Sequence, residues 1–168
     1  MAERPSPARQ CFGCGSDNPH GLGMHFRIED GRAVADFTPP AHLQGYPGHV
    51  HGGGVATMLD EAMGWAVYGS GAWAMTARFA MRFRQPVLAG EPLVVSGWVT
   101  RDRGRFLEVR AEARSRDGAL LAEADGMFVR VRGEQAETLR RLYEAAADAP
   151  GETGRQTDTI TSLSDGRP

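Results

Sequence analysis

The stretch with the clearest chemical potential is GHVHGGGVATMLDEAMGWA, which runs from Gly48 to Ala66. It places His51 directly before three glycines, and an acid pair, Asp60 and Glu61, follows inside an apolar run. A helix N-terminus presents unpaired N–H groups and the positive end of the helix dipole, and both favour a developing negative charge. Glycines there let a ligand oxygen approach the backbone closely. The pattern predicts an oxyanion hole made of backbone N–H donors.

A simpler interpretation is that Gly52–Gly54 only permit a tight junction between a loop and a helix. Three consecutive glycines cost conformational entropy, which favours the functional interpretation. The acid pair adds a second clue, because Asp60 lies about 140° from the centre of the apolar stripe of the helix. The face that it shares holds small residues with little charge, namely Ala56, Thr57, Gly64 and Val67. Such a face is typical of a site that a ligand or another helix approaches closely.

Helix geometry also separates the two halves of this candidate site. His51 and Asp60 are nine residues apart, which is about 2.5 turns and ~13 Å along the axis. One helix cannot easily direct both at the same reacting atom. Two antiparallel copies related by a twofold axis can bring the glycine turn of one chain beside Asp60 of the other. If both groups are catalytic, the protein is a homo-oligomer, either a dimer with composite active sites or a tetramer built from such dimers.

The flanking sequence predicts strands on both sides of this helix. An Asp30-Gly31 turn joins two short strand patterns, and Gly69, Ser70 and Gly71 end the helix. Beyond the helix the hydrophobic period changes to two, and short turns separate the long strand patterns. The predicted strands cover residues 24–28, 32–37, 76–83, 92–100, 105–115 and 119–132. Neighbouring strands joined by short turns pair antiparallel.

This element order predicts an α+β fold in which an antiparallel sheet wraps around one long central helix. The βαβ alternation of a doubly wound sheet is missing. We expect the domain to span residues 11–132. A flexible leader at 1–10, a C-terminal helix at 133–147 and a disordered tail at 148–168 complete the chain.

Taken together, these segments resemble the hotdog-fold acyl-CoA thioesterases of the phenylacetate-pathway (PaaI) type. His-Gly-Gly followed by Asp60 nine positions after the histidine is similar to the active-site helix of that family. CFGCGSDNPHGLGMHF resembles the opening of one of its subgroups, and TARFAMRFRQPV resembles its second signature. The resemblance covers roughly residues 11–132 and implies a hotdog fold.

The resemblance also implies roles for individual residues. Asp60 matches the essential carboxylate, which activates water or attacks the thioester directly. Gly52 matches the glycine whose N–H polarises the thioester carbonyl, with Gly53 beside it. Thr76 matches a hydroxyl that helps to place the water, and His51 matches the histidine that orients the thioester or the loop.

One position departs from the family pattern. Gly45 stands where many members carry an asparagine, and the polar contact of that asparagine is unfilled or supplied by Gln44. Glu61 is a rival to Asp60 as the acid or a further substrate contact, and His49 is a rival to His51.

Arginines are the candidates for binding the phosphates of CoA. Arg82 and Arg84 follow Thr76, and Arg101, Arg103 and Arg105 surround a hairpin tip. A solvated hairpin is the alternative explanation of the second group. The apolar side chains Met58, Met63, Trp65 and Trp73 are candidates for the acyl pocket, although a place in the core or an interface explains them equally.

Three function classes follow. The first is hydrolysis of acyl-CoA, with CoA as part of the substrate and no separate cofactor. The second is acyl-CoA binding without turnover, and the third is a hotdog hydratase or dehydratase. Hydrolysis is favoured because it needs only one activated carboxylate and one oxyanion site. A nucleophilic serine motif of the G-x-S-x-G type is absent from the sequence.

Cys11 and Cys14 form a C-x-x-C pair with three interpretations: a redox pair, half of a zinc site completed by His20 and His25, or two cysteines near a turn. The turn-rich context and the short central spacing favour the last, so no metal is expected. His20, His25 and His42 are read as loop or surface residues.

The bulk composition excludes several other classes of function. The 168 residues have a formal net charge of −2 and contain no lysine. The charge gives no general attraction to nucleic acid or anionic membranes, and the missing lysine excludes a Walker-type phosphate loop and Schiff-base catalysis. No apolar run approaches the ~20 residues of a membrane span. We therefore expect a cytoplasmic protein.

Overall fold

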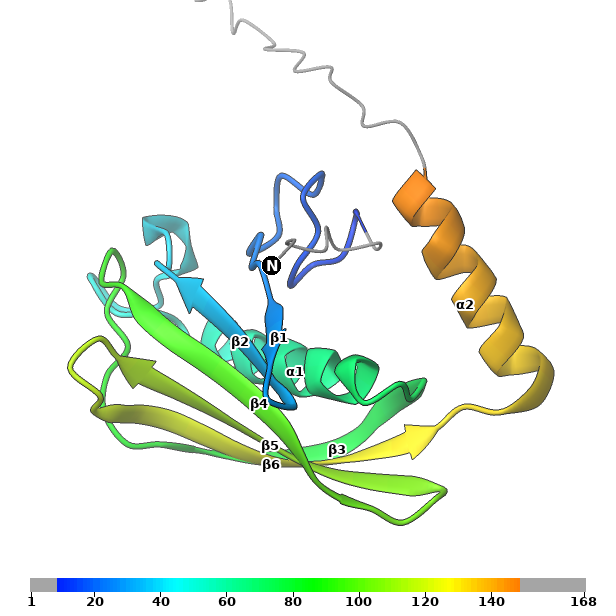
Figure 1. Cartoon of the computed structure of the whole chain (residues 1–168). Helices are drawn as coiled ribbons and strands as arrows, with labels where there is room; N and C mark the ends of the chain where they lie inside the picture. The colour runs from blue at the N-terminus through cyan, green and yellow to red at the C-terminus, as the bar shows by residue number, and fades with distance from the viewer. Residues whose placement is uncertain (1–8, 149–168) are drawn as a thin grey trace, which may run out of the picture.

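The computed structural model describes residues 9–148 of the chain. Within this range the elements follow in the predicted order of two strands, one long helix and four strands (Figure 1). They are β1 (Arg27–Glu29), β2 (Arg32–Phe37), a short 3-10 helix η1 (Ala41–Leu43), α1 (Gly52–Gly69), β3 (Ala74–Phe83), β4 (Leu93–Asp102), β5 (Phe106–Ser115), β6 (Leu120–Arg130) and α2 (Gly133–Asp148). Most of the predicted leader and tail, residues 1–8 and 149–168, lies outside the described residues.

Only β2 has the predicted bounds, and each of the other five strands differs at one end or both by one to three residues. β1 covers only Arg27–Glu29, the three residues that pair with β2, and Met24 and Phe26 are buried in the core before it begins. β3 starts at Ala74, two residues before the predicted start at Thr76. The turn at Asp30 and Gly31 is confirmed, and both residues have positive φ angles of 48° and 77°.

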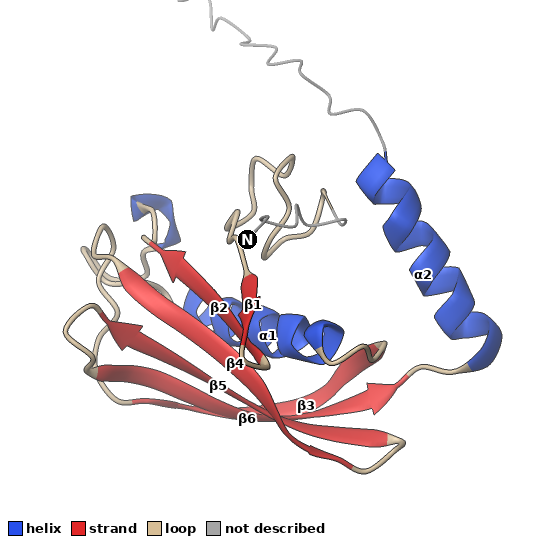
Figure 2. Cartoon of the chain, in the orientation of Figure 1, coloured by secondary structure: helices blue, strands red, loops and turns tan. Residues whose placement is uncertain are grey.

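The six strands form one antiparallel sheet in the order β1-β2-β4-β5-β6-β3. Figure 2 shows the sheet curving beneath α1, which lies along its inner face. This arrangement confirms the predicted α+β class with a sheet around a central helix. The side chains of Val55, Leu59, Ala62 and Ala66 fill the space between helix and sheet, as their spacing predicts, and each is at most 2% exposed.

Two glycines let α1 lie unusually close to the sheet. A Cβ atom on Gly97 of β4 would lie 2.3 Å from the carbonyl oxygen of Ala62. A Cβ atom on Gly126 of β6 would lie 2.7 Å from the sulfur of Met63. The contact at Gly97 is with the helix backbone, so the missing side chain there sets how closely α1 lies on the sheet, whereas Gly126 leaves room for the side chain of Met63.

The outward face of α1 is narrower than the sequence predicts. Val67, which was expected to share a face with Asp60, is only 2% exposed. The expectation was wrong because the apolar stripe of a helix marks only the face that packs on the sheet. Other segments also cover the C-terminal half of α1. One of them is the loop before β1, where Phe26 stacks on Trp65 with a ring separation of 5.8 Å.

The last helix, α2, is attached through aromatic contacts. Tyr143 lies 5.5 Å from the ring of Tyr68 and 5.2 Å from the ring of Trp73. Burial raises the pKa of the Tyr143 hydroxyl.

Neither helix that the structure describes is both long enough and apolar enough to cross a membrane.

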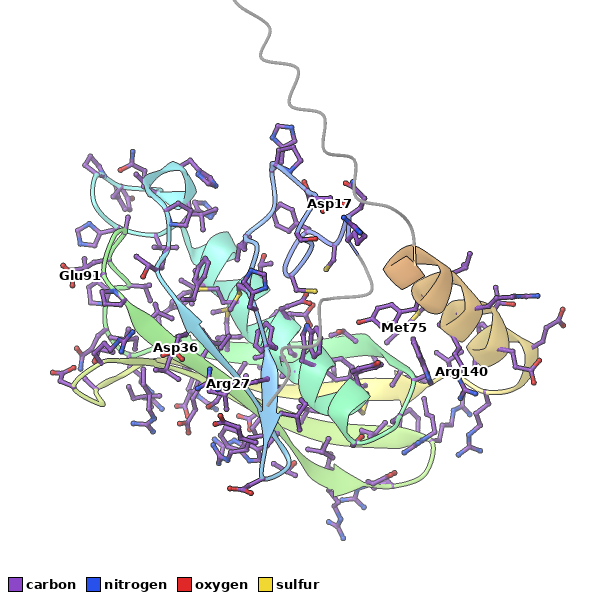
Figure 3. The ribbon with its side chains drawn as sticks, turned by 45° about the horizontal axis from the view of Figure 1, so that its top comes forward. Asp17, Arg27, Asp36, Met75, Glu91 and Arg140 are labelled. Carbon is purple, nitrogen blue, oxygen red and sulfur yellow. The ribbon has the colours of Figure 1, made fainter. Side chains whose placement is uncertain are left out.

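Ion pairs connect neighbouring segments along the sheet. Arg27 of β1 pairs with Asp36 of β2 at 2.9 Å, and both side chains are labelled in Figure 3. On β6, Glu123 is only 8% exposed and accepts a hydrogen bond of 2.9 Å from Nε of Arg84. Arg84 thereby lowers the pKa of the Glu123 carboxyl.

Candidate active site

The helix N-terminus is capped in a way that leaves one backbone donor available. Helix α1 begins at Gly52, and the ring Nδ1 of His51 accepts the N–H of Gly53 at 2.9 Å. The N–H groups of Gly54 and Val55 donate to the carbonyl oxygen of His51. Among the residues that the structure describes, this leaves the N–H of Gly52 without a hydrogen-bond partner. Gly52 is therefore the donor at this helix start that can serve an incoming oxygen.

Gly52 opens onto a cleft of about 440 Å³. Its wall is formed by the start of α1, the end of β3 and the segment after it: His49, Val50, Gly52, Val55, Phe83, Arg84, Gln85, Pro86 and Val87. A cleft of this size can accept part of an extended ligand. The predicted His51 does not line this cleft, and the rival His49 does.

His51 lies in a separate hollow beside the N-terminal segment, together with Gln44 and Gly53. The ring of His51 is used as the helix cap, so its placement fits a role in holding the loop. Gln44 acts locally as well, because its side-chain oxygen accepts the N–H of Gly48 at 3.2 Å. A Cβ atom on Gly45 would lie 3.1 Å from the ring of His51. The glycine that departs from the family pattern thus leaves space for this ring.

The carboxylate and the hydroxyl predicted to act together are in contact. The hydroxyl of Thr76 on β3 donates to Oδ1 of Asp60 on α1 at 2.9 Å. Burial raises the pKa of the Asp60 carboxyl, and the Thr76 hydrogen bond opposes that rise. A half-buried carboxylate with a raised pKa and one fixed hydrogen bond is suited to accept a proton. Asp60 and Thr76 do not line the cleft that contains Gly52, so the two groups are apart within one chain.

Glu61 faces a different part of the molecule from Asp60. Its two carboxylate oxygens both lie 3.7 Å from the sulfur of Cys11. Burial raises the pKa of Glu61 to about 7. A hydrogen bond from Cys14 lowers the pKa of Cys11 to about 5. Apart from the C-x-x-C pair itself, no sequence pattern pointed to this contact, because 50 residues separate Cys11 from Glu61.

The zinc ligand set suggested by spacing does not form among the described residues. His20 and His25 are both exposed, and neither belongs to the group of ligand atoms around the two cysteines. His42 is exposed as well, as predicted.

Of the predicted arginines, only Arg84 lines the cleft beside Gly52. Arg82 pairs with Asp125 at 3.4 Å, and Arg103 pairs with Glu108 at 2.7 Å. The guanidinium of Arg105 lies 5.5 Å from the ring of Phe106 at the hairpin between β4 and β5. The predicted acyl-pocket residues Met58, Met63 and Trp65 are core side chains, each at most 5% exposed.

The sequence profile of the Thioesterase superfamily matches residues 47–122, which include α1 and most of the sheet. The chain belongs to this superfamily, which confirms the resemblance read from its motifs.

The bovine (Bos taurus) protein named acyl-coenzyme A thioesterase THEM4 is 35% identical over 123 residues, which are 70% of this chain and 51% of that protein. The chain therefore spans about half the length of the curated relatives that it matches.

Two solved structures share the fold. A thioesterase superfamily protein is 32% identical with a TM-score of 0.66, and the match covers 68% of this chain and 60% of that one. The E. coli PaaI protein from the phenylacetic acid degradation operon has a TM-score of 0.62 at 23% identity, covering 67% of this chain and 82% of that one. The hotdog fold that the resemblance implies is confirmed by these likenesses.

Proposed function

We propose that the protein hydrolyses acyl-CoA thioesters to the free acid and CoA. The observation that carries the proposal is the hydrogen bond between Thr76 and a half-buried Asp60 whose pKa is raised. A carboxylate in this state can take a proton from water as the water attacks the carbonyl carbon, or it can attack that carbon itself. In the first route the C–S bond breaks and the proton that Asp60 took from the water passes to the CoA sulfur. In the second route the sulfur leaves as a thiolate that takes a proton from solvent, and water then hydrolyses the anhydride formed on Asp60, which releases the acid and restores the carboxylate. The name of the bovine relative points to the same substrate class.

The N–H of Gly52 is assigned to the carbonyl oxygen of the thioester, which becomes an oxyanion in both routes. Arg84 lies on the wall of the same cleft, and its guanidinium, which also pairs with Glu123, is assigned to a phosphate of CoA. The reaction needs no cofactor, because one carboxylate and one oxyanion donor supply both requirements of hydrolysis.

We further propose that the active unit is a homodimer with composite sites, in which Gly52 of one chain serves the same thioester as Asp60 of the other. The proposal is supported by the separation of Asp60 from the Gly52 cleft within one chain. It is also supported by β3, which is an edge strand of the described sheet. Met75 and Phe83 on that strand are 51% and 56% exposed, and such an edge favours pairing with a second copy. The proposal includes the pairing of two such dimers into a tetramer. It also includes a cytoplasmic location.

Hydrolysis is tested with a panel of short, long and aromatic acyl-CoAs, read by release of free thiol. The wild-type chain should release thiol from at least one of them, and Asp60→Asn should abolish release while its circular dichroism spectrum and oligomeric state stay unchanged. Binding of acyl-CoA without thiol release would replace the proposal with the binding-protein alternative. Hydration of an enoyl-CoA with the thioester intact would replace it with the hydratase alternative.

The composite site is tested by mixing two inactive chains. The Asp60→Asn chain keeps an intact Gly52, and the Gly52→Pro chain keeps an intact Asp60. Random exchange of subunits gives about half heterodimers, each with one intact site, so about one quarter of wild-type activity should return. Exchange without any recovered activity would place both groups of a site on one chain.

A further inference from the structure

Three potential metal-ligand atoms converge outside the proposed active site. Cys11 and Cys14 belong to the N-terminal segment of residues 9–23, which lies on the side of α1 away from the sheet (Figure 1). Glu61 comes from α1 itself. The two sulfur atoms and a carboxylate oxygen all lie within 4.8 Å of one another. The proposed hydrolysis uses none of these three side chains.

The loop is shaped around the carboxylate. The N–H of Gly15 donates to the carbonyl oxygen of Cys11 at 2.9 Å, which closes the turn that carries both thiols. Gly13 lies between them, and a Cβ atom at that position would be 2.3 Å from Oε2 of Glu61. Because glycine is the residue that leaves this space open, the carboxylate can reach the two sulfurs. Cys14 is only 2% exposed, whereas Cys11 is partly exposed.

The distances suit tetrahedral coordination. With zinc–sulfur bonds of about 2.3 Å and a zinc–oxygen bond of about 2.0 Å, tetrahedral angles place sulfur and oxygen about 3.5 Å apart and two sulfurs about 3.8 Å apart. The observed distance from the Cys11 sulfur to each Glu61 oxygen is 3.7 Å. The upper limit of 4.8 Å among the three ligand atoms exceeds the tetrahedral separations by about 1 Å.

We propose that Cys11, Cys14 and Glu61 bind a divalent cation of the zinc class, with a water molecule as the fourth ligand. Two thiolates and one carboxylate are a donor set that zinc accepts, and soft thiolates select zinc over magnesium or calcium. Binding releases to solvent any proton still held by the two thiols and the carboxyl. The ion joins the N-terminal segment to the helix turn that carries Asp60, so its role is structural and separate from the hydrolysis.

The site is tested on the full chain, produced without a metal-affinity tag in zinc-supplemented medium. Elemental analysis should find about one zinc per chain, and a chromophoric chelator should compete for it measurably. Cobalt added to the chelator-stripped protein should give the visible bands of tetrahedral Co²⁺ and a sulfur-to-cobalt band in the near ultraviolet. These readouts do not depend on enzymatic activity. The metal site can therefore be disproved while the proposed hydrolysis stands, and the hydrolysis can be disproved while the metal site stands.

Variants locate the ligands. Glu61→Gln keeps the volume of the side chain and should weaken zinc binding by at least about 10- to 100-fold, since even the loss of an outer-sphere partner has that effect. Cys14→Ser should remove the near-ultraviolet band or reduce it by about half. The matched control His25→Ala changes an exposed residue of the neighbouring sequence and should retain full zinc content.

Two results would overturn the proposal. One is a folded wild-type chain that takes up no zinc at micromolar free metal while both thiols react with a thiol reagent. The other is a chain that loses two mass units on mild oxidation and binds no metal when reduced, which would make the pair a redox couple. If Cys14→Ser does not fold, Glu61→Gln with the cobalt spectrum decides the outcome.

Discussion

Replacing Thr76 with valine removes one hydroxyl and keeps nearly the same shape. In the wild type this hydroxyl donates to Oδ1 of Asp60 at 2.9 Å and stabilises the ionised carboxylate. Hydrogen bonds to charged groups contribute about 1.5–3 kcal/mol. Thr76 is exposed, so the lower end applies, and 1.4 kcal/mol corresponds to about tenfold in rate. We expect kcat/KM of Thr76→Val to fall by about tenfold.

The pH dependence gives a second, independent readout. The Thr76 hydrogen bond lowers the pKa of Asp60, against the effect of burial. Its loss raises that pKa, and the carboxylate must be ionised to act. The acid limb of the pH profile of kcat/KM should therefore move to higher pH in Thr76→Val, measured by thiol release from the best acyl-CoA between about pH 4 and 8.

The matched control is Thr100→Val, which removes an exposed hydroxyl bonded to the carbonyl oxygen of Glu108 at 3.0 Å. It should leave both the rate and the acid limb in place. If Thr76→Val lowers the rate without moving the acid limb, the hydrogen bond to Asp60 does not control its ionisation. If neither quantity changes, the assignment of Asp60 and Thr76 as a working pair is wrong.

Three further predictions concern the oxyanion donor, the contact between α1 and β4, and the ion pair of Glu123. Gly52→Pro removes the free N–H at the first helical position, where proline is tolerated, and should lower kcat/KM by about 10²–10³; Gly52→Ala, which keeps the N–H, controls for added bulk. Gly97→Ala places a methyl group 2.3 Å from a carbonyl oxygen of α1 and should cost at least about 1–3 kcal/mol in urea unfolding. Glu123, whose folded pKa is lowered by Arg84, contributes stability above its unfolded pKa of about 4.3 that is lost as pH falls. Glu123→Gln should therefore reduce the free energy of unfolding at pH 7 and flatten its decline in acid; an unchanged decline would remove this ion pair from the acid response.

The sequence by itself determined the order of the elements and the candidate chemistry of the chain. The apolar spacing of Val55, Leu59 and Ala62 predicted the buried face of α1, and these residues are buried as expected. Alternation of period two predicted the strands, and the turn at Gly31 was recognisable from its neighbours. These features depend on residues within one or two turns of each other, so local propensity and periodicity are sufficient to predict them. The superfamily was predicted differently, from the resemblance of the His-Gly-Gly and Asp60 motif to a known family.

The tertiary structure alone decided which side chains meet. Asp60 on α1 accepts a hydrogen bond from Thr76 on β3. The ring of His51 caps the start of α1, and His49 rather than His51 lines the cleft beside Gly52. It also brought Glu61 to Cys11, a contact between residues 50 positions apart. Side-chain contacts between distant segments depend on how helix, sheet and N-terminal loop pack together. Packing is a property of the whole core, and a pattern confined to one segment does not encode it.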